Sequence, residues 1–116
     1  MMQSDPLDIA RAYVLRDLCA RGYDDAPTVS LLDQTVSDRR WWVEEWPDGA
    51  GFLPGLVAQD LQDALHDRGV RWPQCRSCET DAVHCLHVDP PLDTEPSWVC
   101  DEGAIVVARV GSLGAQ

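Results

Sequence analysis

Residues 72–111 read WPQCRSCETDAVHCLHVDPPLDTEPSWVCDEGAIVVARVG, and they hold four of the five cysteines and two of the three histidines. Cys75 and Cys78 have a two-residue spacing that lets a tight turn present two thiolates to one metal ion. Cys100 lies well downstream and can return to this turn as a distant ligand. The stretch therefore predicts a zinc site with three cysteine ligands and one further ligand.

The fourth ligand has to come from the segment AVHCLHV, which offers His84, Cys85 and His87. In an extended strand, His84 and Leu86 face one way while Cys85 and His87 face the other. Only one of the three candidates can complete a four-coordinate site without a bend in the strand. The spacing alone leaves the choice open.

A cysteine turn followed by short strands that bring back a distant cysteine is the plan of a zinc ribbon, in which metal replaces much of the hydrophobic core. Residues 82–88, 96–100 and 105–110 are rich in strand-forming side chains. The acidic, proline-rich segment 89–96 predicts a loop because proline cannot donate to a central ladder. One departure from the plan is that no second cysteine follows Cys100 two residues later.

The upstream part of the chain predicts two helices and a hairpin. Apolar residues recur at helical spacing from about 6 to 21, after a capping Ser4 or Asp5, and again from about 53 to 69. Between them, residues 28–36 and 41–46 are rich in β-branched or aromatic side chains and are separated by a polar turn, which predicts a β-hairpin.

The expected fold class is therefore α+β, with two amphipathic helices and a β-hairpin followed by a small zinc-ribbon-like β lobe. A chain of 116 residues is long enough for one domain and too short for two that are each stable alone. We expect a single domain over 1–116, with a helix-hairpin-helix portion at 1–71 and the zinc-ribbon-like portion at 72–116.

Three tryptophans in the expected hairpin form either an exposed aromatic patch or part of the core. In a strand, the adjacent residues Trp41 and Trp42 would point to opposite faces of the sheet. We favour core or half-buried packing for Trp42 and Trp46. Glu44 and Glu45 are expected to be solvated charges rather than an acid/base pair.

Outside the cysteine-rich stretch, the titratable groups favour structural roles. Cys19 is expected to be a small buried residue of the first helix, since no partner with ligand spacing lies near it. His66 is expected to be exposed. Asp60, Asp63 and Asp67 lie on one helix face and predict a solvated acidic surface rather than a cation site.

The composition restricts the partners. Twenty acidic and nine basic residues give a formal net charge of −11, and every basic residue is arginine. This balance disfavours direct binding to nucleic acid, because such binding draws its free energy from basic side chains that release counterions. The absence of Lys and Asn also suggests a genome of high GC content.

The compartment predicted from the sequence is the cytoplasm. The first residues lack the basic start and apolar run of a signal peptide, and no segment reaches the roughly 18 to 20 apolar residues that span a bilayer. In a reducing compartment, a cysteine cluster favours a metal site over a disulfide framework, and the odd total of five cysteines in the chain further disfavours disulfides.

The cysteine-rich stretch resembles an uncharacterised family of small proteins common in actinomycetes. The shared pieces here are Trp72-Pro73, the turn from Cys75 to Cys78, His84-Cys85-Leu86, Trp98-Val99-Cys100 and the closing segment 107–111. The resemblance covers about the last forty residues. It implies His84 as the fourth zinc ligand, beside Cys75, Cys78 and Cys100, and it implies no activity.

Enzymatic interpretations fit the sequence less well. A thioredoxin-like redox site needs its Cys-x-x-Cys early, at a strand-to-helix junction, and here too little chain follows. A zinc deaminase needs His-x-Glu and Pro-Cys-x-x-Cys, which are absent. Three cysteine ligands plus a fourth are typical of a closed, structural site.

The resulting hypothesis is a non-catalytic adaptor or interaction domain with structural zinc and an unknown protein partner. Two alternatives stay open. One is a thiol redox protein that uses Cys75 and Cys78, with Cys85 as resolving thiol. The other is an acidic inhibitor that mimics nucleic acid and engages a basic partner.

Overall fold

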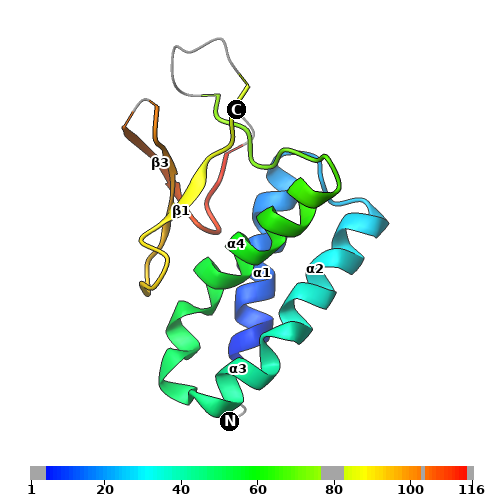
Figure 1. The fold of residues 1–116 in the computed structure, drawn as a ribbon, viewed down its shortest axis with the longest axis vertical. Helices are drawn as coiled ribbons and strands as arrows, with labels where there is room; N and C mark the ends of the chain where they lie inside the picture. The colour runs from blue at the N-terminus through cyan, green and yellow to red at the C-terminus, as the bar shows by residue number, and fades with distance from the viewer. Residues whose placement is uncertain (1–4, 77–82, 103, 115–116) are drawn as a thin grey trace.

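The computed structural model describes residues 5–76, 83–102 and 104–114, and it confirms the α+β fold class. Helices α1 and α4, with α2 beside them, form a layer that covers one side of a small three-stranded antiparallel sheet (Figure 1). No described helix is long and apolar enough to cross a membrane.

Helix α1, Pro6–Ala20, forms where the sequence predicts it. The side chain of Asp5 caps the helix by accepting a hydrogen bond of 2.9 Å from the amide of Leu7. Leu7, Ala10, Val14 and Leu18 recur on one face and are buried. The prediction for Cys19 is wrong, because this side chain is exposed: it lies about 100° around the helix from Leu18, away from the core.

The predicted β-hairpin is also wrong, since the two segments form helices α2, Ala26–Asp38, and α3, Arg40–Glu45. Asp25 caps α2 by accepting from the amide of Thr28 at 3.3 Å and from its hydroxyl at 2.8 Å. Leu32 and Val36 are spaced four apart and are both buried. Helical periodicity of the apolar side chains therefore decided the structure, against the β-branched composition of the segment.

A two-turn 3-10 helix, η1 (Pro47–Phe52), connects α3 to the next helix. The Trp42 and Trp46 rings meet edge to face, with centroids 5.2 Å apart. Gly49 is buried beneath them: a Cβ atom there would lie 2.6 Å from a carbon of each ring. Trp42 is half-buried, as predicted, whereas Trp46 is 43% exposed.

Helix α4, Leu53–Asp67, confirms the second predicted helix and packs against both α1 and α2. Leu53, Val57, Leu61 and Leu65 form its buried stripe. On the opposite side, Asp63, Asp67 and His66 are exposed, as expected. Asp60 differs because the guanidinium of Arg39 donates two hydrogen bonds to it, at 2.6 and 3.0 Å.

The sheet has the strand order β1-β2-β3, with β1 at His87–Asp89, β2 at Ser97–Cys100 and β3 at Ile105–Arg109. Trp98 on β2 is fully buried and pairs in register with Val88 and Ala108. The predicted first strand is shorter than expected and begins at His87. That this sheet is a zinc ribbon stays a prediction.

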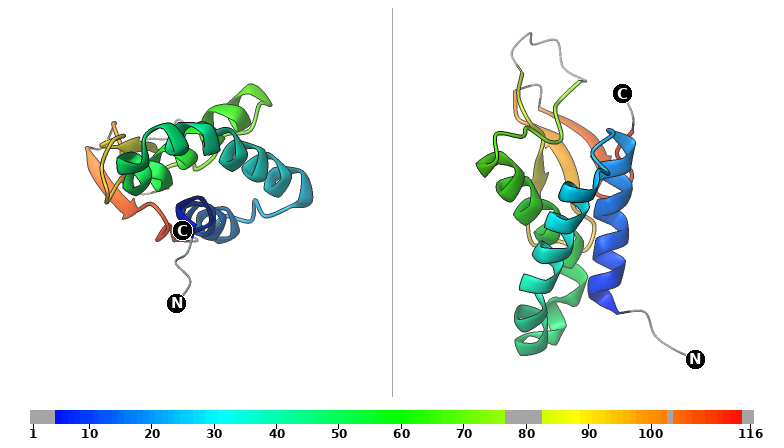
Figure 2. Two further views of the ribbon diagram at one scale, coloured as in Figure 1. Left: turned by 90° about the horizontal axis from the view of Figure 1, so that it is seen from below. Right: turned by 90° about the vertical axis from the view of Figure 1, so that its right-hand side faces the viewer.

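One hydrophobic cluster joins the two predicted portions of the chain, because it contains Leu7, Leu61 and Leu65 together with Trp72 and Trp98. The Trp72 and Trp98 rings meet edge to face, with centroids 5.3 Å apart. The sheet therefore rests directly on the helical core (Figure 2).

A buried carboxylate, Asp17 on α1, connects this helix to the sheet and to the C-terminal segment. It accepts hydrogen bonds from the indole of Trp98 at 2.8 Å and from the amides of Gly111 and Leu113 at 2.6 and 2.9 Å. Burial raises the pKa of Asp17, and the three hydrogen bonds and Arg16 partly oppose this effect.

We expect Asp17→Asn to lower the free energy of unfolding by about 1–3 kcal/mol, because its amide nitrogen would face a buried N–H donor. Urea denaturation followed by circular dichroism measures this change. The exposed Asp63→Asn is the matched control and should change stability by less than about 0.5 kcal/mol.

The same comparison has a defined pH dependence. Because the folded-state pKa of Asp17 is raised, its proton stabilises the native state fully below the unfolded pKa of about 3.9. This contribution is lost as the pH rises through the folded-state value. The stability advantage of the wild type over Asp17→Asn should therefore be larger near pH 4 than near pH 7, and an opposite trend would contradict the raised pKa.

Candidate metal centre

Three side chains from three separate segments converge beside the sheet: Cys75, His84 and Cys100. One potential ligand atom of each lies within 4.8 Å of the other two. His84 Nε2 lies 3.4 Å from Cys100 Sγ. The sequence prediction named all three residues.

Cys75 and His84 are held opposite each other by backbone pairing. The amide of Cys75 donates to the carbonyl of His84 at 2.9 Å, and the amide of Leu86 donates to the carbonyl of Pro73 at 2.8 Å. An isolated antiparallel bridge pairs Gln74 with Cys85. Two short segments thus run antiparallel and place both candidate ligands on the same side.

Arg21, just after α1, fixes this pair of segments to the rest of the fold. Its guanidinium donates to the carbonyl of Gln74 at 2.8 Å and to that of Gly114 at 2.7 Å. Burial lowers the pKa of Arg21, and the nearby Arg76 lowers it further. A guanidinium still keeps its charge at any ordinary pH, so positive charge remains next to Cys75.

Cys100 is fully buried at the end of β2 and is paired in register with Ile105. It lies on the same strand as Trp98, two residues away, so both side chains point to the core face of the sheet. Cys100 is itself a member of the hydrophobic cluster. The candidate centre is therefore attached to the core of the domain.

An acidic side chain that the sequence prediction missed, Glu102, lies near the second ring nitrogen of His84. The Nδ1 atom of His84 lies 3.7 Å from Glu102 Oε2, while Nε2 faces the sulfur of Cys100. A histidine ligand ordinarily has a hydrogen-bond acceptor at its second ring nitrogen, which fixes the tautomer. The signal in the sequence was the position of Glu102, in the turn directly after Cys100.

The chemistry of the three donors fits a metal of the zinc type. Bonds of about 2.3 Å to sulfur and about 2.0–2.1 Å to nitrogen, at the tetrahedral angle, place two ligand atoms about 3.6 Å apart. The separation of 3.4 Å between His84 Nε2 and Cys100 Sγ is close to this value. The cluster could therefore bind a metal ion with little movement of these two side chains.

The predicted ligand Cys78 lies outside the described residues. The two rival ligands, Cys85 and His87, are not members of the cluster. They line a separate cavity of about 260 Å³ together with His66. His87 Nδ1 instead lies 3.3 Å from Asp101 Oδ2. Burial raises the pKa of the Cys85 thiol and so disfavours its thiolate, and the smaller effect of Arg71 opposes this shift.

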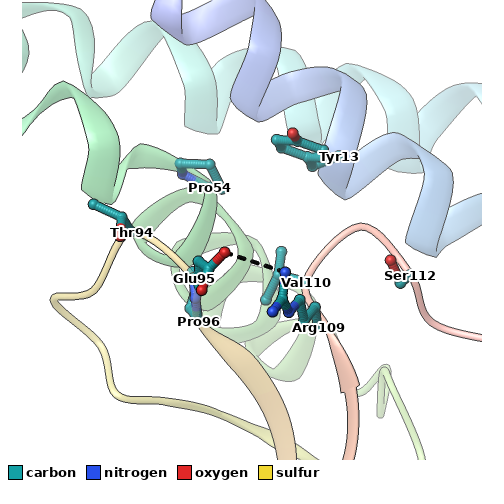
Figure 3. Close-up of a pocket in the computed structure, with 8 residues that line it drawn as sticks. All are labelled: Tyr13, Pro54, Thr94, Glu95, Pro96, Arg109, Val110 and Ser112. Carbon is teal, nitrogen blue, oxygen red and sulfur yellow. Dashed lines mark hydrogen bonds and ion pairs between the residues drawn. The ribbon is translucent and has the colours of Figure 1, made fainter.

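A second cavity, of about 230 Å³, lies between α1, the start of α4 and the ends of β2 and β3 (Figure 3). Its charged lining residues, Arg109 and Glu95, form an ion pair of 3.2 Å with each other. Tyr13 closes it on the α1 side. Because these two charged residues are paired with each other, we assign the cavity no role.

The fold and the cluster define the class of this protein: a small α+β domain with a Cys/His group that could bind a metal ion. The chain belongs to a family described as a domain of unknown function, DUF8819, which matches residues 3–110. The match includes every described helix and strand and all three residues of the cluster. No curated protein and no solved structure matches the chain.

Thiol alkylation tests the environment of the cysteines without any assumption about metal. We expect iodoacetamide to modify Cys19 several-fold faster than Cys85 near pH 8, because Cys19 is exposed while burial raises the pKa of Cys85. Peptide mass spectrometry of the native protein, treated with chelator, measures both rates.

The control is the protein unfolded in urea, in which the two cysteines should react at similar rates. Rapid selective alkylation of Cys85 in the native protein would contradict the buried environment. It would favour the thiol redox alternative, in which Cys85 is a reactive group.

Proposed function

We propose that this domain binds one structural zinc ion through Cys75, Cys78, His84 and Cys100, and that it serves as a non-catalytic interaction domain. The observation that carries the proposal is the convergence of Cys75, His84 and Cys100, which come from three separate segments, on one point beside the sheet. Cys78 is included because a Cys-x-x-Cys turn presents both thiolates to one ion.

Zinc is favoured over other metals by the donor atoms. Thiolate and imidazole ligands suit Zn²⁺, whereas Mg²⁺ and Ca²⁺ take oxygen ligands. Three sulfur ligands and one nitrogen ligand form a closed set with no position for substrate, which is typical of structural rather than catalytic zinc.

The metal has a clear structural task in this fold. Strands β1, β2 and β3 contain three to five residues each. Among the described residues, two backbone hydrogen bonds join the segments around Cys75 and His84. A bound ion would join this segment to the end of β2. Its binding free energy would then add to the stability of the folded state.

Metal content tests this proposal directly. Native mass spectrometry should find one zinc ion per chain, and removal of the metal should lower the free energy of unfolding by about 4 kcal/mol where free zinc is about 1,000-fold above its Kd. Cys75→Ser and Cys100→Ser should lose the metal, whereas Cys19→Ser and Cys85→Ser should retain it.

A cobalt-substituted sample gives a second readout, because thiolate-to-cobalt absorption bands reflect the number of sulfur ligands. A wild-type protein that carries no metal and is indifferent to chelator would refute the proposal. Retention of zinc by Cys85→Ser together with its loss in His84→Ala would assign the fourth ligand.

Glu102 should affect the metal through His84. We expect Glu102→Gln to weaken zinc binding by about tenfold. Loss of a carboxylate next to a histidine ligand typically lowers metal affinity by about 10- to 100-fold, and the exposed position of Glu102 places it at the lower end of this range. Competition with a chromophoric chelator measures the affinity.

Asp101→Asn is the matched control for this variant. It is the neighbouring residue, and it removes an equivalent carboxylate from His87, which lies outside the cluster. Equal weakening by the two variants would show a general charge effect rather than an orienting role for Glu102.

A further inference from the structure

Trp41, on the short helix α3, is the most exposed of the five tryptophans. It is 69% exposed, whereas Trp72 and Trp98 are fully buried. An indole left in water is unfavourable for the isolated domain, and exposed tryptophans are enriched where proteins bind partners. The sequence left open whether the aromatic residues of this segment belong to the core or to a binding surface.

Two carboxylates share the face of α3 that carries Trp41. Glu44 and Glu45 follow it by three and four residues, so their side chains lie one turn along on the same side of the helix. Both are exposed. We call Trp41, Glu44 and Glu45 the Trp41 face.

The Trp41 face lies on a helix whose other side makes packing contacts. On that side of α3, Trp42 packs against Trp46, and buried Gly49 lies against both rings. The guanidinium of Arg39 lies 5.4 Å from the centroid of the Trp42 ring while it binds Asp60. A surface held in this way loses little conformational entropy on binding.

The charges around the Trp41 face are unbalanced. The two neighbouring arginines are already paired, Arg39 with Asp60 and Arg40 with Asp5. Within residues 5–76, 83–102 and 104–114, no basic side chain forms an ion pair with Glu44 or Glu45. An indole beside two unpaired carboxylates is complementary to a cation, which gains a cation–π contact and an ion pair together.

We infer that the Trp41 face binds an arginine- or lysine-rich segment of a partner protein. One basic side chain lies over the Trp41 indole, and its neighbours pair with Glu44 and Glu45. The inference rests on the proposed role as an interaction domain, but it does not require the metal. Nucleic acid and anionic membranes are disfavoured because their phosphates would face two carboxylates, and a second copy is disfavoured by the net charge of −11 on each chain.

A labelled nona-arginine peptide probes this surface, with binding to the full chain followed by fluorescence anisotropy at about 0.15 M salt, where long-range charge attraction is screened. Trp41→Ala should weaken binding by about three- to thirtyfold, and Trp41→Phe by less, because phenylalanine retains part of the attraction for cations. Val106→Ala is the matched control, since Val106 is 67% exposed but lies on β3.

The contribution of the two carboxylates of the Trp41 face is tested with two matched double variants. The double variant Glu44→Gln/Glu45→Gln and the double variant Asp63→Asn/Asp67→Asn on α4 remove the same net charge from exposed positions. Only the first should weaken binding of the peptide strongly. Near-ultraviolet circular dichroism of each variant checks that the aromatic cluster beneath α3 is intact.

Three outcomes would overturn the inference. They are no binding by the wild type, equal weakening by the two charge variants, and self-association of the wild type that Trp41→Ala abolishes. The zinc content of the same samples is measured separately. A metal-free protein that still binds the peptide through Trp41 would therefore refute the zinc site alone.

Discussion

The carboxylate of Asp17 holds together parts of the chain that are more than 80 residues apart in sequence. It lies in the last turn of α1, and its partners are the Trp98 indole on β2 and two backbone amides after β3. A carboxylate in the core is costly unless its oxygens are hydrogen-bonded, and here three donors meet it. This side chain therefore adds a directional constraint to the hydrophobic packing that seats the sheet on the helices.

The candidate metal centre depends on the same arrangement. Cys100 lies two residues beyond Trp98, so whatever fixes the indole also fixes the buried sulfur. Arg21, which follows α1, fixes the Gln74 carbonyl beside Cys75. The first helix thus positions two of the three clustered side chains, although it contributes none of them.

The sequence predicted α1, α4 and the last two strands because their apolar patterns and stop signals agree with their tertiary environment. It also named Cys75 and Cys100 as candidate metal ligands, because few side chains other than cysteine and histidine suit a zinc site. The residue spacing left His84, Cys85 and His87 as alternatives, and the resemblance implied His84. The bridge between Gln74 and Cys85, which places His84 opposite Cys75, is a pairing that no local pattern encodes.

The wrong predictions have physical reasons of the same kind. The hairpin was predicted from β-branched composition, but the burial of Leu32 and Val36 at a spacing of four stabilises a helix. Asp17 could not be distinguished from the other acidic residues, because its role comes from donors that are distant in sequence. Trp41 could not be placed either, since its exposure follows from the helix that replaced the expected strand.

The distribution of the tryptophans gives the domain two built-in optical reporters. Trp72 and Trp98 form one edge-to-face pair in the core near Cys100, and Trp42 and Trp46 form another beside α3. In Figure 1, α3 lies at the opposite end of the molecule from the segments that flank residues 77–82. Trp72 and Trp98 therefore place intrinsic fluorophores beside the sheet, and Trp41, Trp42 and Trp46 place others at the opposite end, without any attached dye.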